Sequence, residues 1–416
     1  MSGHEAERRP TAGLRGASWD ASKLPAQLKT CVYPLATADG AQVVGYLHAL
    51  GDEKAVIMIM HPRELLVSHY SVPYLLTAGY ACFVLGPRTI GNDLRLEHEI
   101  AILDVAAGMS HLRSMGFEKI LMLGNSGGAG LFAFYNQQCL LEGSSRLTKT
   151  PGGRPCKLPE ADMPPADGFI FLAPHPGQGR LLLNCIDPSV TDETDPMSTD
   201  ASLDPLSAQN GYRPHPGLSR YDTEFAKRYR AAQHARVAKI DKQAKEQIVE
   251  RMGARARNKT TPNTNDALRG SLNSIFVVWR TDADLRCFDL SMDPSDRRWG
   301  TVWGADPIAS NLGAVGFGRV CTPESWLSTW SGISSNASFE RCGASIEQPV
   351  LMLYYTGDNT VFPSDADAIF ATIKSSNKMR MNVRGNHHGH ALKAGEPLGQ
   401  DIAIGHAVEW LRATFT

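Results

Sequence analysis

The stretch Lys119-Ile120-Leu121-Met122-Leu123-Gly124-Asn125-Ser126-Gly127-Gly128 decides the fold. Its first five residues form a short apolar run typical of a buried strand, and residues 129–136 have the pattern of a helix start. Between them lies the pattern G-x-S-x-G, a sharp strand-to-helix turn that strains the serine backbone and raises its hydroxyl above a sheet. The small residues suit a point where strand and helix nearly touch. The sequence therefore predicts Ser126 as a presented nucleophile.

Apolar runs of strand length recur on both sides of this stretch. Upstream strands are expected at 30–35, 42–47, 54–60 and 81–85, and downstream strands at 168–172, 350–355 and 379–383. Helical patterns occur at 96–115, 365–373 and 402–413. Strands that alternate with helices predict an α/β fold with a mostly parallel central sheet and helices on both faces.

The alternation of strands and helices stops after residue 172 and resumes only at residue 350. Such a stretch is too long to be a loop within a compact domain and predicts an inserted subdomain. We expect a flexible arm at 1–25, a first part of the core at 26–184, an inserted cap subdomain at 185–335 and a C-terminal part of the core at 336–416. A shorter interruption at 144–166 is expected to be a loop.

The predicted cap contains a helical pattern and many aromatic residues. Residues 227–259 hold eleven lysines or arginines against three acids, which most often marks a solvated helix face. Five of the seven tryptophans lie within residues 273–330. Because an aromatic wall over a sheet edge suits an apolar or aromatic ligand, we expect substrate contacts from Trp279, Trp299, Trp303 and Trp326.

Composition excludes several classes of protein. Lysine plus arginine (42) balances aspartate plus glutamate (43), which argues against a nucleic-acid partner. No apolar run is long enough to span a membrane, and the first residues lack the apolar core of a signal peptide. The eight cysteines are scattered without a C-x-x-C pair. These features predict a reduced, cytoplasmic protein without structural zinc.

A serine nucleophile needs a base and an acid that orients the base. Asp358 follows the predicted strand 350–355, and three histidines, His387, His388 and His390, follow the predicted strand 379–383. The carboxyl ends of parallel strands share one sheet edge, so these residues are expected near Ser126. We expect His388 as the base, with His387 and His390 as alternatives. The three histidines could instead bind a metal, but no carboxylate or cysteine pattern accompanies them, so no metal is expected.

These motifs resemble the α/β-hydrolase superfamily. The resemblance rests on the elbow at 124–128, on Gly357-Asp358, on the G-x-x-H pattern at 385–388 and on His61-Pro62-Arg63, which corresponds to the H-G-x oxyanion loop. It implies an α/β-hydrolase fold with Ser126 as nucleophile, His388 as general base and Asp358 as its partner. It also implies an oxyanion hole formed by the backbone N–H groups of Gly127 and Arg63, because Pro62 has no N–H to donate.

The resemblance implies a serine hydrolase without a cofactor, acting on a small-molecule ester or lactone. The aromatic cap favours a bulky hydrophobic or aromatic substrate. Carbon–carbon bond hydrolysis, a lyase reaction or ligand binding without turnover remain alternatives, and a homo-oligomer, dimer or tetramer, is compatible with the long insertion. His61 and His175 are expected to be structural, Asp187 is a rival acid, and Asp365 and Asp367 are expected to cap a helix.

Overall fold

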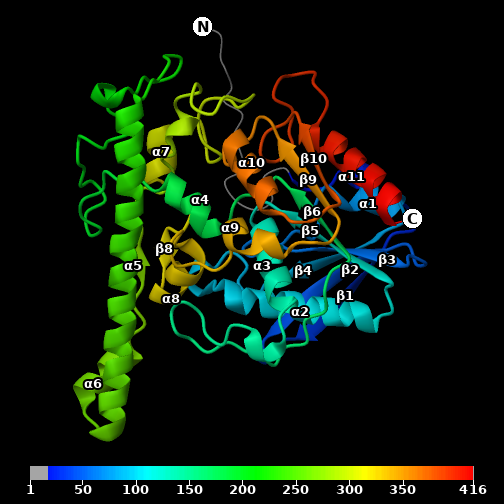
Figure 1. The fold of residues 1–416 in the computed structure, drawn as a ribbon, viewed down its shortest axis with the longest axis horizontal. Helices are drawn as coiled ribbons and strands as arrows, with labels where there is room; N and C mark the ends of the chain where they lie inside the picture. The colour runs from blue at the N-terminus through cyan, green and yellow to red at the C-terminus, as the bar shows by residue number, and fades with distance from the viewer. Residues whose placement is uncertain (1–16, 416) are drawn as a thin grey trace.

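The computed structural model describes residues 17–415. Its centre is an eight-stranded sheet with the order β1-β2-β4-β3-β5-β6-β9-β10 (Figure 1). β2 runs antiparallel to both of its neighbours, β1 and β4, and the other neighbouring pairs in this sheet are parallel. This order is that of the α/β-hydrolase fold, as predicted. The strands are β1 (Lys29–Ala36), β2 (Gln42–Ala49), β3 (Ala55–Ile59), β4 (Ala81–Gly86), β5 (Lys119–Asn125), β6 (Gly168–Leu172), β9 (Val350–Tyr355) and β10 (Lys378–Val383).

Helices cover both faces of the sheet because the central strands are apolar on both sides. All side chains of β4, β6 and β9 are buried. One face packs against α1 (Val72–Thr77) and α11 (Gly399–Phe415). The opposite face packs against α2 (His98–Ser114), α3 (Gly127–Cys139), α9 (Phe339–Cys342) and α10 (Pro363–Thr372).

The predicted strands are all present within a residue or two of their expected ends. The helix α1 was not predicted, because it has six residues and is too short to show a period. The predicted loop at 144–166 contains only a single short turn of 3₁₀ helix at Gly143–Ser145 and one isolated bridge.

A flexible arm is expected at 1–25, and residues 1–16 of it lie outside the described residues. Residues 17–25 differ from this expectation, because they contact the core. Ala17 is buried, and its carbonyl accepts a hydrogen bond from the Tyr70 backbone N–H at 2.9 Å. The Trp19 backbone N–H donates to the Ser68 carbonyl at 2.6 Å, and Lys23 forms an ion pair with Asp401. This part of the chain is held against the core by backbone hydrogen bonds.

The cap segment, which we define as residues 185–335, lies beside the edge of the sheet (Figure 1). Its largest element is α5 (Thr223–Thr260), which buries Val237, Ile240 and Ala244 against α4 (Gln178–Cys185). The remaining elements are α6 (Thr264–Ser271), the two-stranded pair β7 (Phe276–Val277) and β8 (Val320–Cys321), α7 (Pro307–Leu312), α8 (Pro323–Ser325), 3₁₀ turns at Ala208–Asn210 and Leu285–Cys287, and a π-helical turn at Trp326–Trp330.

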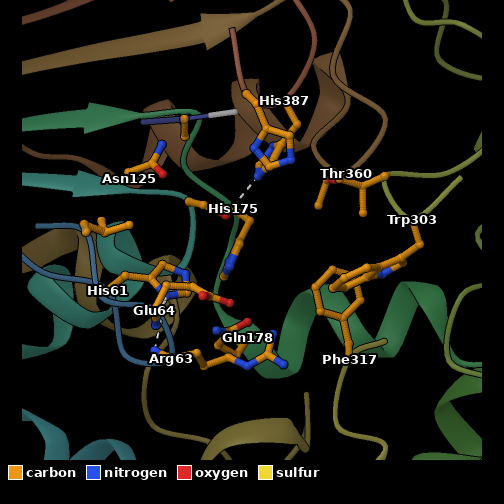
Figure 2. Close-up of a pocket in the computed structure, with 15 residues that line it drawn as sticks. His61, Arg63, Glu64, Asn125, His175, Gln178, Trp303, Phe317, Thr360 and His387 are labelled. Atoms are coloured by element: carbon orange, nitrogen blue, oxygen red, sulfur yellow. Dashed lines mark hydrogen bonds between the residues drawn. The ribbon is translucent and has the colours of Figure 1, made fainter. Parts of the chain in front are cut away.

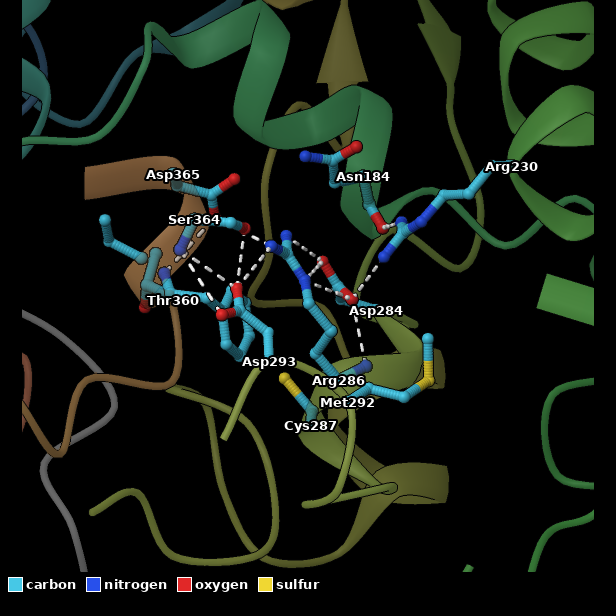
Figure 3. A network of polar contacts seen from close by, with 12 residues as sticks. Asn184, Arg230, Asp284, Arg286, Cys287, Met292, Asp293, Thr360, Ser364 and Asp365 are labelled. Carbon is cyan, nitrogen blue, oxygen red and sulfur yellow. Dashed lines mark hydrogen bonds and ion pairs between the residues drawn. The ribbon is translucent and has the colours of Figure 1, made fainter. Parts of the chain in front are cut away.

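A buried ion-pair network joins the cap segment to the core (Figure 3). Arg286 of the cap segment contacts Asp284 at 2.8 Å and reaches Asp365, at the start of α10, at 3.0 Å. Burial alone would raise the pKa of Asp284, but the guanidinium groups of Arg230 and Arg286 hold that pKa below its ordinary value. Asp293 accepts hydrogen bonds from the backbone N–H and the hydroxyl of Ser364. The network fixes the cap segment next to the loop that carries Asp358.

Replacing Arg286 with leucine should lower the free energy of unfolding by about 3–5 kcal/mol, because Asp365 would lose its arginine and the buried Asp284 would keep only Arg230. Arg257→Leu is the matched control, since Arg257 pairs with Asp266 on the exposed surface of the cap segment and exposed pairs contribute little. Urea denaturation of both variants measures the difference. Equal, small effects would show that the buried network does not hold the cap segment.

Candidate active site

Ser126 lies at the strained turn between β5 and α3. Its backbone has φ 52° and ψ −115°, a conformation that non-glycine residues rarely adopt. Glycines permit the close packing around it: a Cβ on Gly124 would lie 2.6 Å from Ala129 Cα, and one on Gly128 would lie 2.3 Å from the Met60 carbonyl oxygen. The turn therefore presents the serine hydroxyl beyond the end of β5, where it contacts His387.

Ser126, His387 and Asp358 form a continuous hydrogen-bonded chain. His387 Nε2 lies 3.0 Å from Ser126 Oγ, and His387 Nδ1 lies 2.6 Å from Asp358 Oδ2. The second carboxylate oxygen of Asp358 accepts the backbone N–H groups of Thr360 at 2.7 Å and Val361 at 3.2 Å. Asp358 is fully buried, so its carboxylate is fixed to hold the proton on His387 Nδ1 and leave Nε2 as an acceptor.

The structure places His387, and not the expected His388, between Ser126 and Asp358. The conformation of this loop is fixed by the Asn386 side chain, whose carbonyl oxygen accepts hydrogen bonds from the backbone N–H groups of His388 and His390 at 3.0 and 2.9 Å. The turn that results directs the His387 ring to the serine. His388 still lines the cavity beside it, with its ring 5.2 Å from that of His387.

Arg63 does not offer the backbone N–H expected of it for an oxyanion hole. That N–H donates to His61 Nδ1 at 3.1 Å, and the Glu64 N–H donates to the same atom at 3.1 Å. The His61 ring thus accepts hydrogen bonds from its own loop, and the two backbone N–H groups that follow Pro62 already have a partner. The Arg63 side chain forms a two-point ion pair with Asp93 at 2.7 and 2.9 Å, and not with its neighbour Glu64.

Gly127, the other expected oxyanion donor, begins helix α3. Backbone N–H groups in the first turn of a helix have no partner within the helix, and the helix dipole favours negative charge there. Gly127 is also the point on which three side chains converge. A Cβ added to it would lie 2.8 Å from Gln178 Nε2, 2.8 Å from His61 Nε2 and 3.1 Å from His175 Nε2.

The cavity at Ser126 is small, and ten of its fifteen lining residues are polar (Figure 2). Its volume is about 80 Å³, against roughly 300–1,000 Å³ for ordinary ligand pockets. Trp303 and Phe317 of the cap segment form an aromatic wall opposite His61. Their rings pack edge to face with centroids 5.3 Å apart. The polar side chains of the lining belong to His61, Arg63, Glu64, Asn125, His175, Gln178, Thr360, His387 and His388.

Of the four tryptophans expected at the site, only Trp303 lines this cavity. Trp326 is fully buried in the cap segment and donates to Asp241 at 2.7 Å. Trp299 stacks on His215 with ring centroids 5.4 Å apart, and Trp279 lies on the cap segment away from the cavity lining. Trp326 and Trp299 pack within the cap segment. A count of aromatic residues in the sequence does not distinguish this role from that of a ligand wall.

The rival acids lie elsewhere. Asp187 is fully buried and pairs with Arg280 of the cap segment at 2.7 Å. Asp365 accepts the Phe362 backbone N–H at the start of α10, as expected of a helix cap, and also binds Arg286. Asp367 pairs with Arg380. Asp358 is the carboxylate that contacts a histidine at Ser126.

Comparison with known proteins adds little beyond this geometry. The chain matches no protein-family model and no curated protein sequence at a significant level. Similar solved structures include a siderophore hydrolase, EstB, from Aspergillus fumigatus (11% identity, TM-score 0.48, covering 94% of this chain and 98% of that one). An esterase from Pyrococcus furiosus has 12% identity and a TM-score of 0.46, covering 96% and 95%. A hypothetical protein from Pseudomonas aeruginosa has 11% identity and a TM-score of 0.48, covering 94% and 95%.

Residues 17–415 contain neither a membrane-spanning helix nor a metal-binding cluster. Within this range no helix combines the length and apolar character that crossing a bilayer requires. The same residues contain no group of three or more histidine, cysteine or carboxylate side chains arranged to hold a metal ion.

The stability of the protein should carry the signature of a buried neutral histidine at the site. Burial, with smaller contributions from the nearby His387 and His98, lowers the pKa of His175 to about 3. Below pH 6.5 the unfolded chain binds a proton at this residue that the folded chain does not bind, so the free energy of unfolding falls as the pH falls.

Between pH 7 and pH 5 this one side chain should account for about 2 kcal/mol of lost stability. The test is urea denaturation of the wild type and of His175→Asn at both pH values. The variant should lose about 2 kcal/mol less than the wild type over this interval. An identical loss in the two proteins would mean that His175 is protonated in the folded state.

Proposed function

We propose that the protein is a serine hydrolase that cleaves a carboxylic ester or lactone through an acyl-enzyme. The observation that carries the proposal is the unbroken chain Ser126 Oγ–His387–Asp358, at 3.0 and 2.6 Å, on a strained strand-to-helix turn. Burying a carboxylate beside an imidazole costs stability, so a pair of this kind indicates a functional site. Activation of a serine hydroxyl is the task that this order of atoms performs.

In the proposed reaction His387 Nε2 takes the proton of Ser126 as its oxygen attacks the substrate carbonyl. Asp358 stabilises the imidazolium that forms, because its carboxylate is fixed by two backbone N–H groups. His387 then gives the proton to the departing alcohol oxygen. A water molecule, activated by the same imidazole, releases the acid from Ser126.

The cavity guides the choice of substrate. Ser126 shares the cavity with the polar side chains, and Trp303 and Phe317 of the cap segment form its aromatic wall. This arrangement supports an ester with a compact acyl part next to the serine and an aromatic or apolar part against the cap segment. A substrate as bulky as the aromatic cap suggests would need the cap segment to move, since the cavity measures about 80 Å³.

A fluorophosphonate probe should label the wild-type protein once, on Ser126. Intact-protein mass followed by peptide mapping measures the adduct, and Ser126→Ala should take up none. The probe reacts only with a serine whose hydroxyl is activated by a base. Absence of an adduct on the folded wild type, also with a small phosphonyl fluoride that fits a narrow cavity, would overturn the proposed function.

Exchange of the two adjacent histidines should separate the base from its neighbour. His387→Gln should lower kcat for an aryl acetate by roughly 10³-fold or more, because the proton acceptor is lost. His388→Gln should cost less than about 10-fold, since His388 contacts the cavity but not Ser126. Steady-state kinetics of both variants measures the contrast. A larger loss of kcat in His388→Gln than in His387→Gln would identify His388, the residue expected from the loop pattern, as the base.

A further inference from the structure

The two strands beside the elbow strand each lead into a His-Pro pair. In the sheet, β5 lies between β3 and β6. His61-Pro62 follows β3, and His175-Pro176 follows β6. Because the three strands are parallel, their carboxyl ends meet at one edge. The two histidines thus flank Ser126 from opposite sides, although they are 114 positions apart in the chain.

Both histidines have the same tautomer, and backbone N–H groups fix it. His61 Nδ1 accepts the N–H of Arg63, two residues later, and His175 Nδ1 accepts the N–H of Gly177 at 3.2 Å, also two residues later. An Nδ1 that accepts a hydrogen bond has no proton, so the proton of the neutral ring is on Nε2. Burial lowers the pKa of each ring far below its ordinary value, so both rings are neutral at neutral pH.

The donors of these side chains share one target. His61 Nε2, His175 Nε2 and Gln178 Nε2 all lie within 3.1 Å of the point where a Cβ on Gly127 would be. All three side chains line the cavity that contains Ser126. Gln178 is 2% exposed, and its Oε1 has no hydrogen-bond partner among residues 17–415. This oxygen is an acceptor, so it would bind a donor group of the ligand and not the oxyanion; only the Nε2 group of Gln178 can donate to the oxyanion.

We propose that His61, His175 and Gln178 form an oxyanion hole built from side chains, which acts with the Gly127 backbone N–H. The proposal rests on the serine hydrolase function proposed above. As the bond from Ser126 Oγ to the carbonyl carbon forms, the carbonyl π electrons move to its oxygen, and the serine proton passes to His387. The three side-chain N–H groups stabilise that oxygen. They take the place of the Arg63 backbone N–H, which is already donated to His61.

Neutral donors suit this position better than charged ones. Two imidazolium rings beside His387 would repel the proton that His387 must accept during the attack. Neutral rings aligned in advance stabilise the developing charge without reorganisation and place no positive charge beside His387. The ligand that the site selects is therefore an oxygen that becomes negative during the reaction, such as the one in a tetrahedral ester intermediate or a boronate adduct.

Two substitutions remove donors while keeping the loops. In His175→Asn the Asn oxygen can still accept the Gly177 N–H, but nothing remains at the Nε2 position. Gln178→Met keeps the length of the side chain and removes its N–H groups. Each should lower kcat for an aryl acetate by roughly 10²–10³-fold, with KM changed less than about 3-fold. Each should also weaken inhibition by phenylboronic acid by a factor that follows the loss in kcat. His175→Gln, which returns an N–H near the Nε2 position, should recover part of the activity.

His69→Asn is the matched control. Like His175, His69 is fully buried, has its pKa lowered by burial to about 3 and accepts at Nδ1 a backbone N–H two residues later, but it lies outside the cavity lining. It should leave kcat within about 2-fold. If the wild type turns over and His175→Asn and Gln178→Met keep its kcat, the side-chain oxyanion hole is wrong and the hydrolase stands. A wild type that takes up no fluorophosphonate overturns both proposals. If His175→Asn does not fold, Gln178→Met decides.

Discussion

The strained turn at Ser126 is the constraint on which the site depends. A positive φ at a serine is unfavourable, and here it is maintained by contacts too close for any side chain, with Gly124 against Ala129 and Gly128 against the Met60 carbonyl. Those contacts fix the ends of β3, β5 and α3 relative to one another. The loops that follow the neighbouring strands therefore lie around the serine hydroxyl.

The site uses histidine both as a proton acceptor and as a hydrogen-bond donor. The hydrogen-bond partner of Nδ1 determines which of these roles each ring has. Asp358 holds a proton on Nδ1 of His387, so that Nε2 accepts from Ser126. Backbone N–H groups occupy Nδ1 of His61 and His175, so that Nε2 of each ring donates. A carboxylate thus makes a base, and an amide N–H makes a donor, from the same neutral imidazole. The Arg286 network keeps the cap segment beside the loop that carries Asp358. It thereby helps to exclude water from the histidine base and from the histidine donors.

Much of this could be predicted from the sequence. Apolar runs show the buried strands, and glycines around Ser126 show the elbow. Asp358 follows from its position after a strand. The choice of His387 over His388 could not be predicted, because it depends on which backbone N–H groups the Asn386 side chain accepts. Trp326 and Trp299 could not be separated from Trp303 because all are aromatic residues of the cap segment. The sequence also contains a His-Pro pair after both strands that flank the elbow, although it predicts a structural role for both histidines.

The central claim is that an oxygen developing charge at Ser126 is held by side chains as well as by the Gly127 N–H. A crystal structure of the Ser126 adduct with a small aryl phosphonate tests it directly, since the phosphoryl oxygen stands for the oxyanion of the tetrahedral intermediate. The account predicts that oxygen at roughly 2.7–3.1 Å from His61 Nε2, His175 Nε2 and Gln178 Nε2, with Gly127 N at a similar distance. A phosphoryl oxygen that turns away from both histidines, toward the cap segment or bulk water, would contradict it.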